Sequence, residues 1–378
     1  MGWRTRKVIA ARSSHALALL TTFLLLLPVE AELGAPRASV PETGPLVIEN
    51  QTGITIRNRR IHNPTGPCVT IRRSSGVLIE GLQIGPCAGN GIAVTESHDV
   101  TIASSRISTQ RSGRAGLDSG LGVYILTSSN VVVRGSHFVA NESGVHAVQS
   151  RAIRVLGNYF AGPLGPRPRG VHTQLGYVSG GEVTGNYGVA DATDLPVGLE
   201  ADQEDAINIY RSTGISVARN YLVGGNSPSG CGIIVEGRES ADNVIEENIL
   251  VRTGNCGIGI GNGVRNIVRA NKVLDTNIPR GAGNVGIYVA HMLSRAQRQA
   301  RARGENVQRE VTCFDNVVVG NVVSNQLPAG HHSDIYTPNT CERTVREGNL
   351  TGSAARVNLL PEADRLLPPP IPPLPHAP

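Results

Sequence analysis

Lysine and aromatic residues are scarce in this chain. Lys7 and Lys272 are the only lysines among 378 residues, and aromatic side chains make up 3% of the sequence. A fixed positive charge in any site must therefore come from arginine. The sequence also lacks a phosphate-binding loop, a nucleophile elbow and a dinucleotide fingerprint, so it carries no motif of the enzyme classes that those features mark.

Long apolar runs are missing as well, apart from residues 16–27 near the N-terminus. This run is too short to cross a bilayer as a helix. Basic residues precede it, and Val29-Glu30-Ala31 follows as a small-residue cleavage site, which predicts that residues 1–31 are a signal peptide. We therefore expect a secreted or periplasmic protein without a transmembrane helix in its mature chain. Removing the signal lowers the net charge from +5 to about +2, which does not favour nucleic acid as a partner.

Glycine, in contrast, is abundant, and it opens a phrase that recurs along the chain. The phrase reads Gly-apolar-x-apolar, then a small polar turn, then a second apolar-x-apolar stretch. The alternation is typical of short strands, and each copy is too short for a helix. A unit that cannot bury its own apolar face must stack on its neighbours. The copies begin at Gly91, Gly122, Gly144, Gly170, Ala206, Gly232, Gly257 and Gly286.

A polar residue closes the second strand of most copies. Asparagine tolerates a left-handed backbone and its amide can bond to the amides above and below it, so a stack at this bend is a structural ladder. We assign it no chemistry. The ladder comprises Ser105, Ser136, Asn158, Asn186, Asn220, Asn248, Asn271, Asn321 and Asn349.

The segments GIAV…VTIASSRI, GVYI…VVVRGSHF and AINI…ISVARNYL resemble the repeats of right-handed parallel β-helix proteins, the pectin-lyase-like superfamily. The resemblance implies an all-β, single-stranded solenoid of about ten coils over residues 46–352. Residues 32–45 would then be a linker or cap, and residues 353–378 a Pro-rich tail. The fold hosts lyases, epimerases, hydrolases and adhesive proteins. The polygalacturonase motifs and the Asp-Pro-His-Asp phrase of alginate epimerases are absent.

The six cysteines suit disulfides in an exported chain. Cys231 and Cys256 each precede the opening glycine of consecutive copies, and Cys313 and Cys341 each lie eight residues before a ladder asparagine. Stacked positions about 4.8 Å apart can be bridged. We predict the pairs Cys231–Cys256, Cys313–Cys341 and Cys68–Cys87. The alternative is a column of buried reduced thiols.

Side chains at the outward position x form a column on one sheet face. Four successive copies place Tyr124, His146, His172 and Asn208 there, with Gln174, Tyr210, Glu236 and Tyr288 nearby. Long connections at 108–121, 161–169, 187–205 and 275–285 would wall this face. A groove of rings and hydrogen-bonding groups about 15 Å long is typical of a polysaccharide site. The expected substrate-binding residues are Tyr124, Asn208, Gln174, Glu236 and Tyr288.

His146 and His172 are expected to be stacked neighbours that disfavour a shared charge, so one stays neutral as a base. A uronate lyase or epimerase needs such a base and a cation facing the substrate carboxylate. Arg169 and Arg211 are candidates for that cation, and Tyr210 or Asp205 for further proton transfer. The alternative is a polar surface column without catalysis.

Asp202, Glu204 and Asp205 lie just before the Asn208 strand, where they could transfer protons or bind Ca²⁺. The alternative is a structural acidic loop. Asp202 and Asp205 would be the pair of a glycoside hydrolase. A pair of Asp205 with Glu236 is not expected, because a straight strand would separate them by about 16 Å.

Residues 291–311 form an Arg-rich insertion that is expected to be helical, as a solvated helix or an anion clamp. The sequence thus predicts a monomeric β-helix that binds a polysaccharide, with acidic polymers among the candidates, and modifies it as a lyase or epimerase. A non-catalytic envelope or adhesive protein is the rival, and a glycoside hydrolase the second alternative. No cofactor other than Ca²⁺ is indicated.

Overall fold

The structure is a computed structural model that describes residues 41–109, 120–190, 200–275, 285–293, 295–307, 312–327 and 331–365. Most of these residues form short strands, and each coil adds one strand to each of three long sheets. All strand pairs within the sheets are parallel. The first pair joins β1 to β4 with Glu42 opposite Arg60, and the later pairs follow the same pattern. The predicted parallel β-helix is therefore confirmed.

Sheet A has 12 strands. They are β1 (Glu42–Thr43), β4 (Arg60–Asn63), β7 (Gln83–Cys87), β10 (Arg106–Ile107), β13 (His137–Val139), β16 (Tyr159–Ala161), β19 (Tyr187–Val189), β22 (Tyr221–Val223), β25 (Ile249–Val251), β29 (Lys272–Leu274), β33 (Val322–Ser324) and β36 (Leu350–Thr351).

Sheet B has 11 strands and carries the predicted site column. They are β2 (Leu46–Glu49), β5 (Val69–Arg72), β8 (Ile92–Thr95), β11 (Leu121–Leu126), β14 (Ser143–Val148), β17 (Thr173–Gly176), β20 (Ile207–Tyr210), β23 (Cys231–Glu236), β26 (Cys256–Gly261), β30 (Val285–Ala290) and β34 (Ile335–Tyr336).

Sheet C also has 11 strands, and a two-stranded sheet lies beside it. Sheet C comprises β3 (Thr55–Arg57), β6 (Ser75–Glu80), β9 (His98–Ala103), β12 (Ser129–Arg134), β15 (Arg151–Leu156), β18 (Ser179–Thr184), β21 (Thr213–Ala218), β24 (Val244–Glu246), β28 (Ile267–Arg269), β32 (Val317–Val319) and β35 (Val345–Glu347). The small sheet pairs β27 (Gly263–Val264) with β31 (Cys313–Phe314).

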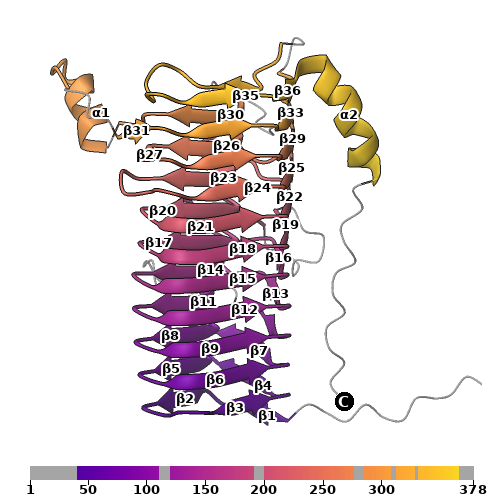
Figure 1. The fold of residues 1–378 in the computed structure, drawn as a ribbon. Helices are drawn as coiled ribbons and strands as arrows, with labels where there is room; N and C mark the ends of the chain where they lie inside the picture. The colour runs from indigo at the N-terminus through magenta and orange to yellow at the C-terminus, as the bar shows by residue number, and fades with distance from the viewer. Residues whose placement is uncertain are drawn as a thin grey trace, which may run out of the picture. The chain divides into compact units, whose positions relative to one another are not determined.

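Figure 1 shows the three columns of strands stacked along one axis, with the first strands at the bottom and the last at the top. One continuous core runs between them, built from the alternate inward residues of every strand. Ile71, Ile209 and Ile260 have no exposed surface, and Phe138 and Phe160 stack with their ring centroids 4.8 Å apart. The core explains why the phrase needs apolar residues on both sides of x.

The asparagine ladder is present as predicted. Each amide Nδ2 donates to the Oδ1 of the next asparagine, for example at 3.0 Å from Asn158 to Asn186 and at 2.9 Å from Asn220 to Asn248. The ladder asparagines also satisfy buried backbone carbonyls, such as that of Val183. Their role is structural, because the bend would otherwise leave these carbonyls without donors.

The corner between sheets B and C turns through one left-handed residue in successive coils. The column comprises Asn50, Arg73, Glu96, Thr127, Gln149, Tyr177, Arg211, Gly237 and Asn262, all at positive φ. The left-handed conformation turns the chain sharply from one sheet to the next. It also projects each of these side chains away from the core, so the corner presents a row of variable groups.

One coil departs from the predicted register. β17 pairs with β14 through Val145↔Thr173 and His146↔Gln174, so the phrase of this coil starts at His172 and not at Gly170. Elsewhere the phrase-initial glycine makes room for a core side chain of sheet A. A Cβ atom at Gly144 would lie 2.6 Å from the Phe160 ring. In the displaced coil, sheet A carries Gly188 of β19 at the position where the preceding coil carries Phe160. The His172 ring fills the space that a larger side chain at position 188 would occupy.

The three predicted disulfides are confirmed. Cys68–Cys87, Cys231–Cys256 and Cys313–Cys341 have Cα separations of 5.7, 4.5 and 4.6 Å. Cys231–Cys256 and Cys313–Cys341 join equivalent positions of adjacent coils. Cys68–Cys87 does not, because Cys87 at the end of β7 has Asn63 as its partner in register. All six cysteines are therefore oxidised.

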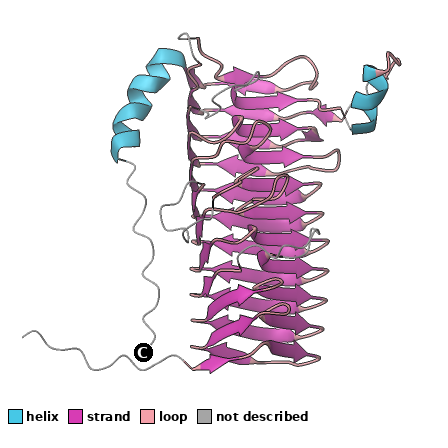
Figure 2. Cartoon of the chain, turned by 180° about the vertical axis from the view of Figure 1, so that it is seen from behind, coloured by secondary structure: helices cyan, strands magenta, loops and turns pink. Residues whose placement is uncertain are grey.

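Among the described residues, two helices lie outside the strand columns (Figures 1 and 2). α1 (Arg295–Ala302) confirms the helical expectation for the Arg-rich insertion. α2 (Gly352–Arg365) buries Ala355 and Leu359 and packs against β29, β33 and β36, so the segment that was expected to begin a Pro-rich tail at residue 353 is helical up to residue 365. Among the described residues, no helix is both long and apolar enough to cross a membrane.

Several predicted segments lie outside the described residues. These are the signal peptide at 1–31, most of the linker at 32–45, the Pro-rich end at 366–378, the larger part of the connections 108–121 and 275–285, and residues 191–199 of the connection 187–205. The connection 161–169 is described. Its Leu164 packs against Val139 and Tyr159 of sheet A.

Candidate functional site

The outward column of sheet B brings Tyr124, His146, Gln174 and Asn208 into register on successive coils. Gln174 occupies the place that the sequence assigned to His172. The Tyr124 and His146 rings meet edge to face, with centroids 6.2 Å apart. The predicted row of rings and amides is present, but the two histidines are not stacked neighbours.

His172 points into the core, which corrects the prediction that it faces outward. It is 2% exposed, and its ring stacks on Phe160 with centroids 5.6 Å apart. Burial lowers the pKa of His172 to about 3, and the backbone at Val189 acts in the opposite direction. Neither ring nitrogen has a hydrogen-bond partner of good geometry among the described residues. A ring that no substrate can reach is not the base that the sequence suggested.

His146 and Arg169 lie together beside a buried carboxylate. Arg169 forms an ion pair of 2.6 Å with Glu142, and the side chains are only 12% and 2% exposed. Burial, together with the charge of Arg169, lowers the pKa of His146 to about 4. His146 is therefore neutral at physiological pH because of its burial and Arg169, and not because of a stacked His172. Arg169 is bound to Glu142 and is a weaker candidate for a substrate carboxylate.

The carboxylates of the acidic segment 202–205 bind partners on different segments of the chain. Asp202 pairs with Arg167 at 2.8 Å, and Glu204 accepts hydrogen bonds from Ser227 and Ser229. Because these carboxylates face different partners, Asp202, Glu204 and Asp205 do not converge as calcium ligands would. In the described part of the chain, no three His, Cys, Asp or Glu side chains form a group that could hold a metal ion.

Asp205 and Glu236 are brought together by Asn208. The Asn208 Nδ2 donates to Asp205 Oδ2 at 2.9 Å and to Glu236 Oε1 at 3.0 Å. The two hydrogens of an amide nitrogen diverge by about 120°, which places the two acceptor oxygens about 5 Å apart. The expectation that these carboxylates lie far apart is wrong. Asp205 precedes β20, where the chain bends, and its side chain folds back over the strand.

The electrostatics of this pair are unusual. Burial raises the pKa of Asp205 to about 7, against the hydrogen bonds from Asn208 and from the Cys231 amide, and the nearby charge of Glu236 adds to the rise. Asn208 Oδ1 is buried and has no donor among the described residues. A carboxyl group that titrates near neutrality, beside an unsatisfied acceptor, is typical of a reactive or ligand-binding site.

An apolar cluster covers the buried side of the carboxylate pair. It contains Ile234, Val285 and the Cys231–Cys256 disulfide, with Tyr288 packed against it. The Tyr288 ring lies over Gly259, where a Cβ atom would come within 2.8 Å of the phenolic oxygen. Burial and the charges of Asp205 and Glu236 raise the pKa of Tyr288. Tyr288 thus stays protonated beside the two carboxylates.

Glu236, at the end of β23, lines a pocket of about 290 Å³. Tyr210 and Arg211 lie on one side of it, and Arg298 of α1 on the other. Arg298 has no ion pair with any described residue. The pocket is lined by Tyr210, Arg211, Glu236, Gly237, Arg238, Gly261, Asn262, Met292, Leu293 and Arg298. A carboxylate beside several arginines is suited to an anionic ligand that exchanges protons.

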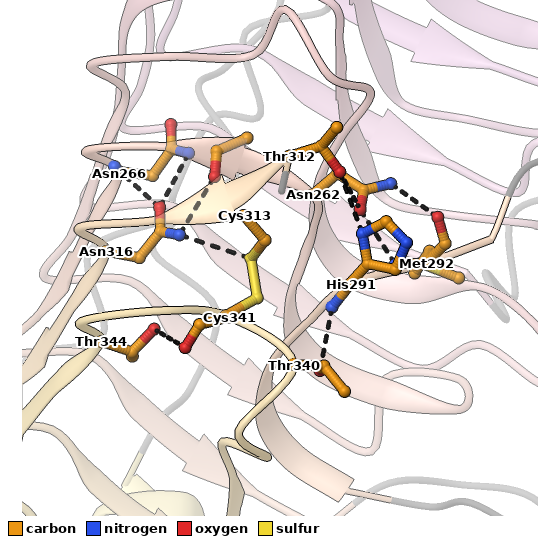
Figure 3. Close-up of a disulfide and its surroundings, with 11 residues drawn as sticks. Asn262, Asn266, His291, Met292, Thr312, Cys313, Asn316, Thr340, Cys341 and Thr344 are labelled. Atoms are coloured by element: carbon orange, nitrogen blue, oxygen red, sulfur yellow. Dashed lines mark hydrogen bonds between the residues drawn. A yellow bond between two sulfur atoms is a disulfide. The ribbon is translucent and has the colours of Figure 1, made fainter. Parts of the chain in front are cut away.

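Asn262 holds the insertion against this pocket. Its side chain exchanges two hydrogen bonds of 2.9 Å with the Met292 backbone and accepts a third from Thr312. Figure 3 shows Asn262 between Thr312 and Met292, with His291 beside them and the Cys313–Cys341 disulfide nearby. Both ends of the insertion are therefore fixed next to the pocket that Arg298 lines.

The structure thus assembles part of the predicted site. Tyr210, Arg211 and Glu236 share one pocket, with Asp205, Asn208 and Tyr288 behind it. Tyr124, His146 and Arg169 lie some coils away toward the N-terminal end. Sequence reasoning missed Arg238 and Asn262. It singled out the Arg-rich insertion but did not connect Arg298 to Glu236.

Comparisons with known proteins agree with this fold. Residues 41–160 match the family model of the right-handed beta helix region. Among solved structures, the chain resembles a double mutant of the periplasmic alginate epimerase AlgG, with 14% identity, a TM-score of 0.50 and coverage of 84% of this chain and 81% of that one.

Two further matches have different functions. A Paenibacillus alginate lyase has 10% identity and a TM-score of 0.47, with coverage of 74% of this chain and 91% of that one. The Streptococcus pneumoniae surface adhesin PfbA has 12% identity and a TM-score of 0.45, with coverage of 79% and 71%. No curated protein sequence matches the chain. The chain thus has the right-handed parallel β-helix fold.

Proposed function

We propose that this protein binds an acidic polysaccharide in the pocket beside Glu236 and modifies its uronate units by proton transfer, as a lyase or an epimerase. The observation that carries this proposal is the Asn208-bridged pair of Asp205 and Glu236 at the edge of an arginine-lined pocket. Three disulfides are typical of a protein that works outside the cytoplasm, where such polymers occur.

Arg298 would face the substrate carboxylate, together with Arg211, whose ion pair of 3.3 Å with Glu239 is more exposed to solvent than that of Arg169 with Glu142. Their charge lowers the cost of removing the neighbouring C5 proton, because the electrons left behind spread onto that carboxylate. Glu236 lines the pocket and would accept the proton. Asp205 lies behind it and shares the Asn208 amide, so it would tune the basicity of Glu236 and not touch the sugar itself.

Tyr210 would complete the proton transfer. Partial burial raises its pKa, so the phenol stays protonated at neutral pH. In elimination, the C4–O bond breaks as the C5 proton leaves, and the departing oxygen takes a proton from Tyr210. In epimerisation, a proton returns to C5 on the opposite face and no bond to oxygen breaks.

A retaining glycoside hydrolase is a second candidate, because the separation of the carboxylates favours it. Retaining enzymes hold their two carboxyl groups about 5 to 5.5 Å apart. A pKa of about 7 suits an acid, but this role would require the buried Asp205 carboxyl to reach the sugar, with Glu236 as the nucleophile. Asp202 does not suit this role, because it is paired with Arg167.

The experiment is proton NMR of alginate, pectate, glycosaminoglycans and neutral glucans before and after incubation with the mature chain, with and without Ca²⁺. Vinylic signals indicate elimination, altered uronate anomeric signals epimerisation, and new reducing ends hydrolysis. Glu236→Gln preserves the hydrogen bond to Asn208 and should lose turnover. Glu246→Gln, a matched change on sheet C, should retain it. Unchanged spectra with every polymer would contradict catalysis and leave the non-catalytic binding protein.

A further inference from the structure

Tyr177 is the bulkiest residue in the left-handed column at the corner of sheets B and C. Its φ is 55°, and 47% of its surface is exposed. A left-handed backbone is strained for a bulky side chain and persists where the surroundings impose it. The two coils before it carry Thr127 and Gln149 at this position, and the coil after it carries Arg211. An exposed aromatic ring at such a place is available to a ligand.

Arg211 connects Tyr177 to the pocket of Glu236. Its guanidinium carbon lies 5.6 Å from the centroid of the Tyr177 ring and 5.3 Å from that of Tyr210. Its Nη1 also donates a hydrogen bond of 3.2 Å to the Tyr177 hydroxyl. The two tyrosine rings meet edge to face at 5.5 Å. Tyr177 therefore continues the wall of the pocket on the coil below.

A wider hollow begins on the other side of Tyr177. It measures about 530 Å³ and lies along the same corner toward the N-terminal end. The Arg151 side chain lines it, and no described residue forms an ion pair or hydrogen bond with that side chain. Its lining comprises Thr127, Ser128, Ser129, Gln149, Ser150, Arg151, Tyr177 and Ser179.

We infer that this corner is a binding track for the polymer outside the reactive pocket, with Tyr177 as the platform on which a sugar ring stacks and Arg151 as the cation for the acid group of a more distant unit. The inference rests on the proposed function, because it takes the Glu236 pocket as the reactive end. The track from Arg211 to Thr127 crosses three coil steps, or about 14 Å, which is enough for several sugar units. The polymer then runs toward the N-terminal end of the solenoid.

The test compares the affinities of uronate dimers and octamers, measured by calorimetry on the Glu236→Gln protein so that the ligand stays intact. Tyr177→Ala should weaken octamer binding by about threefold to tenfold, the range of aromatic stacking contacts, and leave the dimer unchanged. Tyr177→Phe keeps the ring and should bind the octamer like the parent. Tyr336, which is 56% exposed on β34 at the other end of sheet B, provides the control Tyr336→Ala.

Three results would overturn the inference. Equal losses for dimer and octamer would place Tyr177 in the reactive pocket. A loss in Tyr177→Phe as large as in Tyr177→Ala would make the hydroxyl, which positions Arg211, the important group. An effect of Tyr336→Ala alone would send the polymer in the opposite direction. If the octamer binds through Tyr177 but no polymer is turned over, the track stands and the catalytic proposal fails.

Discussion

Replacement of His172 by leucine should make the fold less sensitive to acid. The His172 ring is buried between sheets A and B, stacks on Phe160 and leaves both ring nitrogens without hydrogen bonds. Leucine has a similar volume and cannot be protonated. At pH 7.5 the lost ring stacking and the removed unsatisfied nitrogens offset each other, so we expect a change within about 1 kcal/mol.

The acid effect follows from the pKa of His172, which is about 3 in the fold against 6.5 in the unfolded chain. As the pH falls below 6.5, the unfolded chain binds the proton first, so stability is full above pH 6.5 and is lost between 6.5 and about 3. Each pH unit below 6.5 lowers the free energy of unfolding by about 1.4 kcal/mol. The loss is about 3 kcal/mol at pH 4.5 and about 5 kcal/mol at pH 3. His172→Leu removes this loss.

The measurement is guanidinium unfolding followed by circular dichroism at pH 7.5 and 4.5, with the disulfides intact. The free energy of unfolding of His172→Leu should exceed that of the parent by about 3 kcal/mol more at the lower pH. His331→Leu changes an exposed histidine and serves as the control. A difference between variant and parent that is the same at both pH values would refute the burial of a neutral His172.

The remaining predictions concern the pocket. Arg298→Gln should raise KM for an acidic polymer severalfold at low salt, and Arg301→Gln on the same helix should not; equal effects would mean general attraction by the helix. Asp205→Asn should lower turnover and remove the ionisation near pH 7 from the pH–rate profile. It should also stabilise the fold above pH 7 by about 4 kcal/mol, because a carboxyl with a pKa of about 7 in the fold and 3.8 in the unfolded chain lowers stability as the pH rises. An unchanged pH–rate profile would exclude Asp205 from the catalytic groups. Replacing Cys231 and Cys256 by alanine should cost about 2 to 4 kcal/mol of stability and also turnover, since the Cys231 amide holds Asp205; loss of stability with full activity per folded molecule would contradict that link.

Much of the fold could be predicted from the sequence because its determinants are local and repeated. Alternation specifies which residues enter the core, and the spacing to a phrase-initial glycine or a ladder asparagine specifies which cysteines are stacked. The Asn ladder and the disulfides Cys231–Cys256 and Cys313–Cys341 follow from that rule, whereas Cys68–Cys87 was predicted only from its place in neighbouring coils. Each depends only on the neighbouring coil.

The site depended on features without such periodicity. The sequence at Gly170 fits the recurring phrase, so alternation alone predicts that His172 faces outward. His172 enters the core because Gly188, 18 residues after Gly170 and on another sheet, leaves room for its ring. The pairing of Asp205 with Glu236 depends on a bend before β20 that a straight-strand estimate cannot contain. Arg298 reaches the pocket because Asn262 holds the insertion in place, a tertiary contact across 30 residues.

The exchange of bulk between His172 and Gly188 has a consequence for the history of this coil. The preceding coil combines the phrase-initial Gly144 with Phe160 on sheet A, whereas this coil combines His172 with Gly188. A side chain at Gly188 alone would meet the His172 ring at 2.4 Å, and a glycine at position 172 alone would leave the coil hollow. Every single substitution between the two arrangements passes through an overfilled or an empty core, so we expect descendants of this protein to change both positions together or neither.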